Sequence, residues 1–277
     1  MVVLVTGAGG QLAQSLEFIA SDYPEIKFHF LAISDLDITK TENIDASFKA
    51  LKPDFCINTA AYTAVDKAES DVDTAHLINV VGAKNLAESC KKYNATLLHI
   101  STDFVFDGDS TIPYTEKDIA NPKSVYGKTK KEGEDEIIQT TCQYFIIRTS
   151  WLYSQFANNF MKTMIKLANE RDSLSVVSDQ IGTPTHGVDL AKVIVKVILS
   201  QSKNYGIYHY SNEGVASWYD FAKKIFELNN IKIDLKPIST SEFPTPAQRP
   251  QYSVLDKAKI KSEFNITIDS WQDSLAQ

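Results

Sequence analysis

The feature that most constrains the fold is the glycine loop near the start of the chain, TGAGGQLAQSL, residues 6–16. It follows a short β-branched run and opens a helical pattern, which is the context of a dinucleotide-binding loop. Gly7 permits the tight turn, and Gly10 lets the backbone approach a pyrophosphate at the positive end of the following helix. Ala13 stands where a third glycine is typical and is small enough for helix–strand packing. An ordinary glycine-rich turn is the competing interpretation, and the flanking strand and helix argue against it.

The first half of the chain alternates short apolar strands with helical segments. Continuous apolar strands separated by helices indicate parallel pairing with both faces of the sheet covered. Right-handed crossovers then give an α/β fold with a doubly wound parallel sheet. The predicted strands are 2–7, 27–33, 54–61, 96–102 and 144–150, and the predicted helices are 11–21, 41–51, a long amphipathic 71–92 and one that begins after Pro122.

After Trp151 the alternation loosens, which predicts a second and smaller lobe. We therefore divide the chain into a dinucleotide-binding domain, residues 1–150, and a mainly substrate-binding lobe, residues 151–277. The chain is expected to return to the sheet around residues 185–211. Predicted elements of this half are helices at 157–171, 188–200 and 217–229, a strand at 206–211 and a proline-bearing segment at 237–256.

An acidic residue at the end of the second strand commonly binds the adenosine ribose of a dinucleotide. Asp35 and Asp37 both follow the strand that ends at Ile33, and either fits this position. No arginine stands next to Ile33 to hold the 2′-phosphate of NADP. The cofactor is therefore NADPH or NADH, and the local sequence slightly favours NADH.

The segment NPKSVYGKTKKEGEDEI, residues 121–137, places Tyr126 and Lys130 on one face of a predicted helix. A phenol with an ordinary pKa of about 10 is a poor acid at neutral pH, and we expect the neighbouring lysine cation to lower it. Such a pair suits the reduction of a ketone, in which a cofactor gives a hydride to carbon and Tyr126 gives a proton to oxygen. Lys130 can also hold the cofactor ribose.

Polar side chains also end a buried strand, HISTDFVFDG, at the sheet edge where open α/β folds bind ligands. They are Ser101, Thr102 and Asp103, and a hydroxyl of Ser101 or Thr102 would fix the carbonyl oxygen. This strand end and the glycine loop, in the expected order, argue that the tyrosine–lysine pair is more than a chance spacing. The other charges of the helix are interpreted as a solvated face with pairs such as Lys128–Glu132; they are Lys128, Lys131, Glu132, Glu134, Asp135 and Glu136.

Composition excludes several classes of function. The net charge of −7 argues against a general nucleic-acid binder, and no apolar run is long enough to span a membrane. Cys56, Cys90 and Cys142 are widely spaced and odd in number, which fits a reducing cytoplasm. The five histidines are scattered without ligand spacing, so no metal site is expected.

Nearly end to end, the chain resembles an extended short-chain dehydrogenase/reductase and, more closely, the dTDP-4-dehydrorhamnose reductase family. The YxxxK pattern marks only the superfamily, whereas AYTAVDKAE, STDFVFDG and RTSWLY are much more specific. Further stretches that carry the resemblance are TGAGGQLA, DLDIT, PYTE, NNFMKTMIKLA, VVSDQIGTPT and RPQYSVLD. The resemblance implies a Rossmann-like fold and reduction of dTDP-4-dehydro-L-rhamnose to dTDP-L-rhamnose, with a nucleotide sugar as the partner molecule.

The resemblance also implies roles for particular positions. Thr102, Tyr126 and Lys130 would be the catalytic set, with Tyr126 the proton donor to the C4 ketone. Thr102, Asp103 and Trp151 would contact the nucleotide sugar, and Arg249 is a candidate to bind its diphosphate. The implied cofactor contacts are Gly7, Gly10, Gln11, Leu12, Asp37, Ile38, Ala61, Tyr62, Thr63, Ile100, Tyr126 and Lys130.

Three departures from the family pattern stand out, namely Ala13 in the glycine loop, Ser15 in the first helix and Tyr252 in RPQYS. Some family members dimerise through a metal held by an acidic residue at the position of Ser15, so the serine argues against that metal-bridged dimer here, and a homodimer stays possible. Tyr252 replaces a frequent asparagine, which leaves open a different nucleotide sugar. A non-catalytic regulatory subunit, as in the β type of methionine adenosyltransferase, is the alternative from another class, and it has less need for the intact catalytic set.

Overall fold

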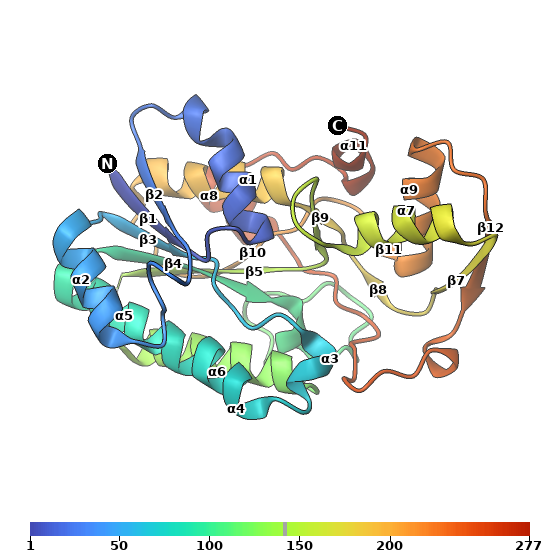
Figure 1. Ribbon diagram of the computed structural model, residues 1–277, viewed down its shortest axis with the longest axis horizontal. Helices are drawn as coiled ribbons and strands as arrows, with labels where there is room; N and C mark the ends of the chain where they lie inside the picture. Colours follow the sequence, from blue (N-terminus) through green and yellow to red (C-terminus); the bar gives the residue numbers. More distant parts are fainter. Residues whose placement is uncertain (141–142) are drawn as a thin grey trace.

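A single parallel sheet organises the molecule, and the predicted doubly wound α/β fold is confirmed (Figure 1). The computed structural model describes residues 1–140 and 143–277, so the interpretation of Cys142 lies outside the described residues. The strand order is β10-β5-β4-β3-β1-β2, and every neighbouring pair is parallel. The strands are β1 Val2–Thr6, β2 Lys27–Leu31, β3 Phe55–Asn58, β4 Thr96–Thr102, β5 Tyr144–Thr149 and β10 Gly206–His209.

Helices cover both faces of this sheet, as continuous apolar strands require (Figure 1). One apolar core lies between the sheet and two of the helices, α1 (Gln11–Ile19) and α8 (Gly187–Ser200). A second core fills the opposite side, under α2 (Thr41–Leu51), α5 (Gly82–Tyr93) and α6 (Val125–Thr140). Two further short helices, α3 Val65–Ala68 and α4 Val72–His76, lie beside α6.

The second half of the chain builds a smaller lobe around its own core, where α7 (Phe160–Glu170) packs on α9 (Trp218–Leu228). Ser217 and Asp220 form a reciprocal capping box that fixes the start of α9. α8 and β10 also belong to this half, yet they lie on and in the large sheet. The remaining elements are β6 Leu152–Tyr153, β7 Ser173–Val177, β8 Ile181–Gly182, β9 Thr185–His186, β11 Ala216–Ser217, β12 Asp234–Ile238, α10 Ala258–Phe264, α11 Trp271–Leu275 and the 3₁₀ helices η1 Ala20–Asp22, η3 Asp103–Val105 and η4 Thr240–Glu242.

The long helix predicted at 71–92 is interrupted. It consists of α4, a π-helical turn η2 (Leu77–Val81) and α5. Asn79, within this turn, is buried and its side chain accepts from the backbone of Tyr62 and donates to Thr129. An apolar period alone does not reveal such a turn, because π-bulges are set by a few local side-chain contacts.

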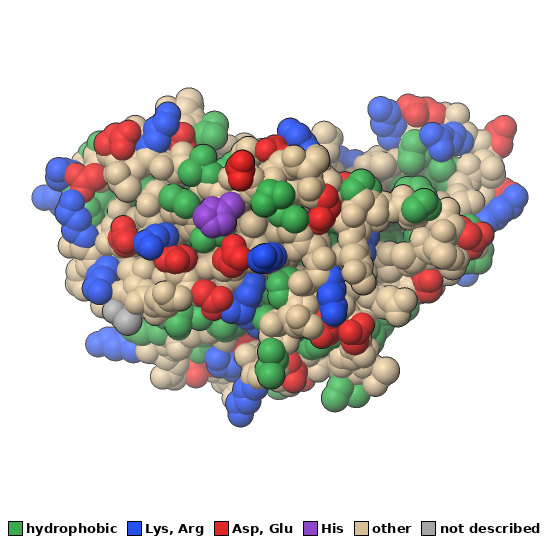
Figure 2. Space-filling model, turned by 90° about the horizontal axis from the view of Figure 1, so that it is seen from below, with side chains coloured by type: hydrophobic (Ala, Val, Ile, Leu, Met, Phe, Trp, Pro, Cys, Tyr) green, Lys and Arg blue, Asp and Glu red, His purple; other side chains and the backbone are tan. Residues whose placement is uncertain are grey.

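The face that carries α4 and α6 shows acidic, basic and apolar side chains interspersed (Figure 2). This mixture is typical of solvated helices and forms no field of one sign. Within the part of the chain that the structure describes, no helix is long and apolar enough to cross a membrane.

Candidate active site

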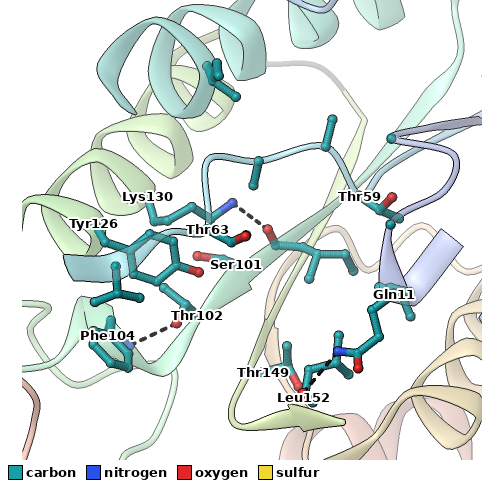
Figure 3. Close-up of a pocket in the computed structure, with 18 of the residues that line it drawn as sticks. Gln11, Thr59, Thr63, Ser101, Thr102, Phe104, Tyr126, Lys130, Thr149 and Leu152 are labelled. Carbon is teal, nitrogen blue, oxygen red and sulfur yellow. Dashed lines mark hydrogen bonds between the residues drawn. The ribbon is translucent and has the colours of Figure 1, made fainter. Parts of the chain in front are cut away.

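A cavity of about 810 Å³ opens along the carboxyl ends of the central strands (Figure 3). It lies where the strand order reverses between β1 and β3, which is where open α/β sheets bind their ligands. Both halves of the chain contribute to its wall. The predicted site residues that line it are Gly7, Gly10, Gln11, Leu12, Asp37, Ile38, Ala61, Thr63, Ile100, Thr102, Asp103, Tyr126, Lys130, Trp151 and Arg249.

The glycine loop forms one end of the cavity because its backbone passes very close to β3. Gly7 has a φ of +72°, and a Cβ there would lie 2.9 Å from the Ala60 nitrogen. Gly10 caps α1 without a side-chain hydrogen bond, so the first N–H groups of the helix are available to an anion. Gln11 reaches across to the other half of the chain, where its amide donates to the Leu152 carbonyl at 3.0 Å. The loop has the shape and the donors of a pyrophosphate site.

Of the two aspartates after β2, Asp37 lines the cavity, whereas Asp35 turns back to accept from the Ala32 nitrogen. Hydrogen bonds from Thr39 lower the pKa of Asp37, so its carboxylate is ionised at neutral pH. Lys40 lies 3.4 Å from the same carboxylate.

Tyr62 is the one predicted cofactor residue that lies outside the cavity wall. Its hydroxyl donates to Asp71 at 3.0 Å and its backbone nitrogen donates to Asn79 at 2.9 Å, and together these contacts hold the residue against α4 and η2. The sequence placed Tyr62 correctly at the carboxyl edge of the sheet but could not give the direction of its ring.

Tyr126 and Lys130 lie on the same side of α6 and face the strand end at Ser101 and Thr102 (Figure 3). The pKa of Tyr126 is raised to about 12, mainly by burial; the Thr102 hydroxyl opposes this change, and Asp103 makes a smaller contribution in the same direction as burial. The expectation of a lowered pKa for Tyr126 is therefore wrong for this structure, because desolvation of the phenol is the largest effect. The consequence is a phenol that stays protonated at neutral pH, as a proton donor must be.

Lys130 is almost completely buried, with 2% of its surface exposed. Its Nζ donates to the Ile100 carbonyl at 2.7 Å and lies 3.1 Å from Nε2 of His99. Burial lowers the pKa of Lys130 to about 8, and the nearby Glu134 opposes this change. Lys130 therefore titrates close to the working range of an enzyme, instead of remaining a permanent cation.

The two hydroxyls at the end of β4 have different partners. Ser101 donates to Glu134 at 2.5 Å. Thr102 donates to Asp103 at 3.0 Å and accepts from the Phe104 nitrogen, which keeps its oxygen beside the phenol. Burial raises the pKa of Asp103 to about 6. Of the two hydroxyls left open by the sequence, Thr102 has the better position to meet a carbonyl oxygen.

Glu134 corrects the prediction of an entirely solvated outer face on α6. It is fully buried and forms a bidentate ion pair with Arg148 of β5, at 2.9 and 2.6 Å. Within the described residues the exposed pairs of this helix are Lys131–Asp135 and Glu136–Lys84, not Lys128–Glu132.

With this geometry in place, comparison with known proteins identifies the family. The profile described as "RmlD substrate binding domain" matches residues 1–277. A dTDP-4-dehydrorhamnose reductase of Aggregatibacter actinomycetemcomitans is 43% identical, and the match covers 99% of this chain and 96% of the relative. The chain belongs to the dTDP-4-dehydrorhamnose reductase family.

Solved structures of the reductase family agree with the fold. A crystal structure of dTDP-4-dehydrorhamnose reductase from Bacillus anthracis in complex with NADP has a TM-score of 0.95 and 41% identity, covering 99% of this chain and 96% of that one. A reductase structure from Clostridium acetobutylicum also has a TM-score of 0.95, with 45% identity over 100% and 97% of the two chains.

The three departures from the reductase pattern all lie outside the cavity wall. Ala13 is buried in the core between the sheet and α1, where its small side chain suits close packing. Ser15 is also buried, and a Cβ on Gly187 at the start of α8 would lie only 2.6 Å from its hydroxyl oxygen. Tyr252 packs with Phe106 and Tyr114 in a small separate cluster. The presence of tyrosine at this position, where the family often has asparagine, therefore does not by itself alter the cavity wall.

The second half of the chain supplies an aromatic stack to the cavity. Trp151, with a φ of +46°, lies parallel to Trp218 at a centroid distance of 3.6 Å, and both line the wall. Gly182 supports the stack from behind, since a Cβ there would lie 2.6 Å from the Trp151 ring. Sequence reasoning did not include Trp218, which is 67 positions beyond Trp151 and is brought to it only by the packing of α9.

Arg249 reaches the cavity from the proline-bearing segment, but its guanidinium is already engaged. Its two terminal nitrogens bind the two carboxylate oxygens of Asp66 at 2.9 and 2.7 Å, and this pairing lowers the pKa of Asp66. Asp66 follows β3 and Arg249 belongs to the second half, so the pair joins the two halves across the cavity mouth.

Proposed function

We propose that this chain reduces the C4 ketone of dTDP-4-dehydro-L-rhamnose to dTDP-L-rhamnose with NADPH or NADH. The observation that carries the proposal is the convergence of Thr102, Tyr126 and Lys130 on one cavity that also contains the glycine loop. The full-length match to dTDP-4-dehydrorhamnose reductases supports the choice of substrate. The sequence alone led to the same family and the same three residues.

The cavity wall fits a nicotinamide dinucleotide, which would supply the hydride. Gly7, Gly10, Gln11 and Leu12 would hold the diphosphate through backbone N–H groups at the start of α1. Lys130 and the Ile100 backbone would bound the ribose beside the ketone. The residues proposed for the adenosine side are Asp37, Ile38, Ala61 and Thr63.

The residues of the chain then perform the proton chemistry. Tyr126, protonated at neutral pH, gives its proton to the ketone oxygen as the carbon is reduced. Thr102 orients that oxygen, and Lys130 restores the charge balance of the phenolate. Asp103, Trp151 and Trp218 would surround the sugar, the tryptophans offering a flat apolar face.

Arg249 takes a modified role in this proposal. A guanidinium that already binds Asp66 on two atoms has little capacity for a bidentate grip on a diphosphate. We infer that it fixes the proline-bearing segment at the cavity mouth and meets the nucleotide through its remaining edge.

Both cofactors are compatible with the adenosine end. The ionised Asp37 favours a ribose with free hydroxyls, as in NADH, whereas Lys40 beside it offers a cation to a 2′-phosphate. The related B. anthracis enzyme was crystallised with NADP. We therefore expect turnover with either cofactor.

The direct test is NADPH or NADH oxidation with enzymatically prepared dTDP-4-dehydrorhamnose. Wild type should turn over, and Tyr126→Phe should lose about 10²- to 10⁴-fold in kcat while still binding cofactor. Tyr205→Phe is a matched control, because that phenol donates to Gln143, just before the amino end of β5, and neither residue lines the cavity. Cofactor binding without oxidation in wild type would instead favour the regulatory-subunit alternative.

We further propose a cytoplasmic location, which the buried free thiol of Cys56 supports, since a reducing compartment preserves it. Homodimerisation stays a prediction from the family resemblance, and light scattering on the purified protein measures it directly. The division at residue 150 is likewise proposed as functional: the first part holds the cofactor and the second closes over the sugar.

A further inference from the structure

Behind Lys130, a chain of buried polar side chains crosses three strands of the sheet. Thr6 of β1, Asn58 of β3 and His99 of β4 are register partners, so the parallel pairing places them side by side. Thr6 donates to the Asn58 carbonyl oxygen at 2.7 Å, the Asn58 amide nitrogen lies 3.0 Å from His99 Nδ1, and His99 Nε2 lies 3.1 Å from Lys130 Nζ. All four residues are at most 2% exposed. Nothing in the reaction scheme above uses the first three.

The direction of these hydrogen bonds is fixed at Asn58. The backbone nitrogen of Ala60 donates to the Asn58 carbonyl oxygen at 3.2 Å, and a backbone N–H can only donate. The Asn58 amide therefore presents its oxygen to Ala60 and Thr6 and its NH₂ group to His99. Nδ1 of His99 must accept that bond, so a neutral ring carries its hydrogen on Nε2. Burial, with a smaller effect of Lys130, holds the pKa of His99 well below its ordinary value and keeps the ring neutral.

This tautomer determines which form of Lys130 fits. The Nε2–H group points at Lys130 Nζ, which also donates to the Ile100 carbonyl. A neutral amine can accept from Nε2–H through its lone pair and still donate to Ile100. An ammonium has no lone pair and would set two donors against each other.

We propose that His99, oriented by Asn58, is a positioning residue that holds Lys130 and favours its neutral amine. The proposal rests on the proposed function for its chemical meaning. When Tyr126 breaks its O–H bond and a new O–H bond forms on the sugar, the phenolate needs a proton. Lys130, loaded from solvent as an ammonium, breaks an N–H bond to supply it, and the Nε2–H group of His99 then donates a hydrogen bond to the lone pair left on the Lys130 amine. His99 thus stabilises the neutral amine that Lys130 becomes after it has given up its proton, and this makes the ammonium a better proton donor.

Other ionisable groups lie on the elements around Lys130. Tyr126 and Glu134 lie one turn before and after it on α6, His99 and Asp103 belong to β4 and its continuation, and Arg148 belongs to β5. Glu134 is bound on both oxygens by Arg148 and also accepts from Ser101, which limits its pull on the Lys130 proton. The hydrogen on His99 Nε2 is therefore the contact that favours the amine most directly.

The first test reads the ring directly, in the cofactor-free full chain, by ¹⁵N NMR of the histidine side chains. His99 is assigned through bonds from its Cβ and by loss of its signals in His99→Gln. We expect a neutral Nε2–H tautomer that does not titrate between pH 6 and about pH 8. An Nδ1–H tautomer or a protonated ring would overturn the proposal. This readout needs no turnover, so it stays decisive even if the enzyme proves inactive on the dTDP sugar.

The second test reverses the tautomer. In Asn58→Asp, Thr6 and Ala60 keep their acceptor, but the carboxylate now requires hydrogen on His99 Nδ1, and Nε2 becomes an acceptor for the ammonium. We expect the Lys130 limb of the kcat–pH profile to move up by roughly one unit, with KM for the nucleotide sugar unchanged. Asn85→Asp is the matched control, because Asn85 is equally a buried amide but bonds to the Ile38 carbonyl. A tautomer that switches while the limb stays in place would refute the role assigned to His99.

Discussion

Lys130 and Glu134 are buried on neighbouring turns of the same helix, yet their surroundings differ. Glu134 has a bidentate arginine and a serine, which together satisfy its charge inside the protein. Among the described residues, Lys130 has only a backbone carbonyl and a neutral imidazole as hydrogen-bond partners, and its other side faces the cavity. A compensated buried charge holds structure together, whereas an uncompensated one changes its pKa and becomes available for proton transfer.

The largest expected effect is a loss of activity on substitution of Lys130, which we do not expect for Glu134. Lys130→Met should lower kcat by about 10²- to 10⁴-fold, because the phenolate of Tyr126 loses its proton source. The variant should unfold at the same temperature as wild type at pH 7 or at a higher one, since burial disfavours the charged form of this lysine. Lys128→Met, exposed on the same helix, is the control for both measurements. A strongly destabilised but active Lys130→Met would break the comparison.

Removing Glu134 should give the opposite pattern. Glu134→Ala leaves Arg148 buried without its counter-charge, which typically costs about 3–5 kcal/mol of stability. Urea denaturation at pH 7 measures this loss, while kcat of the folded fraction should stay within about threefold of wild type. The double variant Glu134→Met with Arg148→Met should recover most of the loss, because an apolar pair of similar volume leaves no buried charge.

The sequence predicted most of the fold because its signals are local. The glycine loop, the apolar strands and the helical periods lie within short windows, and predicted and observed bounds agree for 41–51 and 96–102. The pair Tyr126 and Lys130 was recognisable for the same reason, since four residues along a helix define one face.

What the sequence did not give depends on contacts across the fold. Glu134 is one of several acidic residues in EGEDE, and it differs from the others only because its position on the helix turns it toward β5. A usable signal did exist on the partner strands: Arg148 in YFIIRTS and His99 in TLLHIST are polar residues in buried runs, and each requires a partner. Trp218 offered no such signal, because the stack with Trp151 depends on the packing of a separate lobe.

Asp103 extends the comparison to a carboxylate at the cavity wall. Burial raises its pKa to about 6, so the folded state favours the protonated form. Its contribution to stability is fully present below the unfolded pKa of 3.8 and is lost as pH rises through about 6. Asp103→Asn should therefore be more stable than wild type at pH 7, by at most about 3 kcal/mol, and equally stable near pH 4. Thermal unfolding of both proteins across this range measures it, and a difference that did not change with pH would contradict the assignment.

The smallest expected effect concerns two adjacent hydroxyls. Ser101 contacts the structural ion pair of Glu134, whereas Thr102 lies beside the reactive phenol of Tyr126. Ser101→Ala removes a hydrogen bond to the buried Glu134 carboxylate and should cost about 1.5 kcal/mol of stability with kcat nearly unchanged. Thr102→Val, of similar volume, should instead lower kcat, because Thr102 is the hydroxyl beside the Tyr126 phenol. Unfolding in urea and steady-state kinetics on both variants decide the matter. If Ser101→Ala were the variant that lost activity, Ser101 would have to be assigned to the reactive residues, and only Glu134 would remain structural.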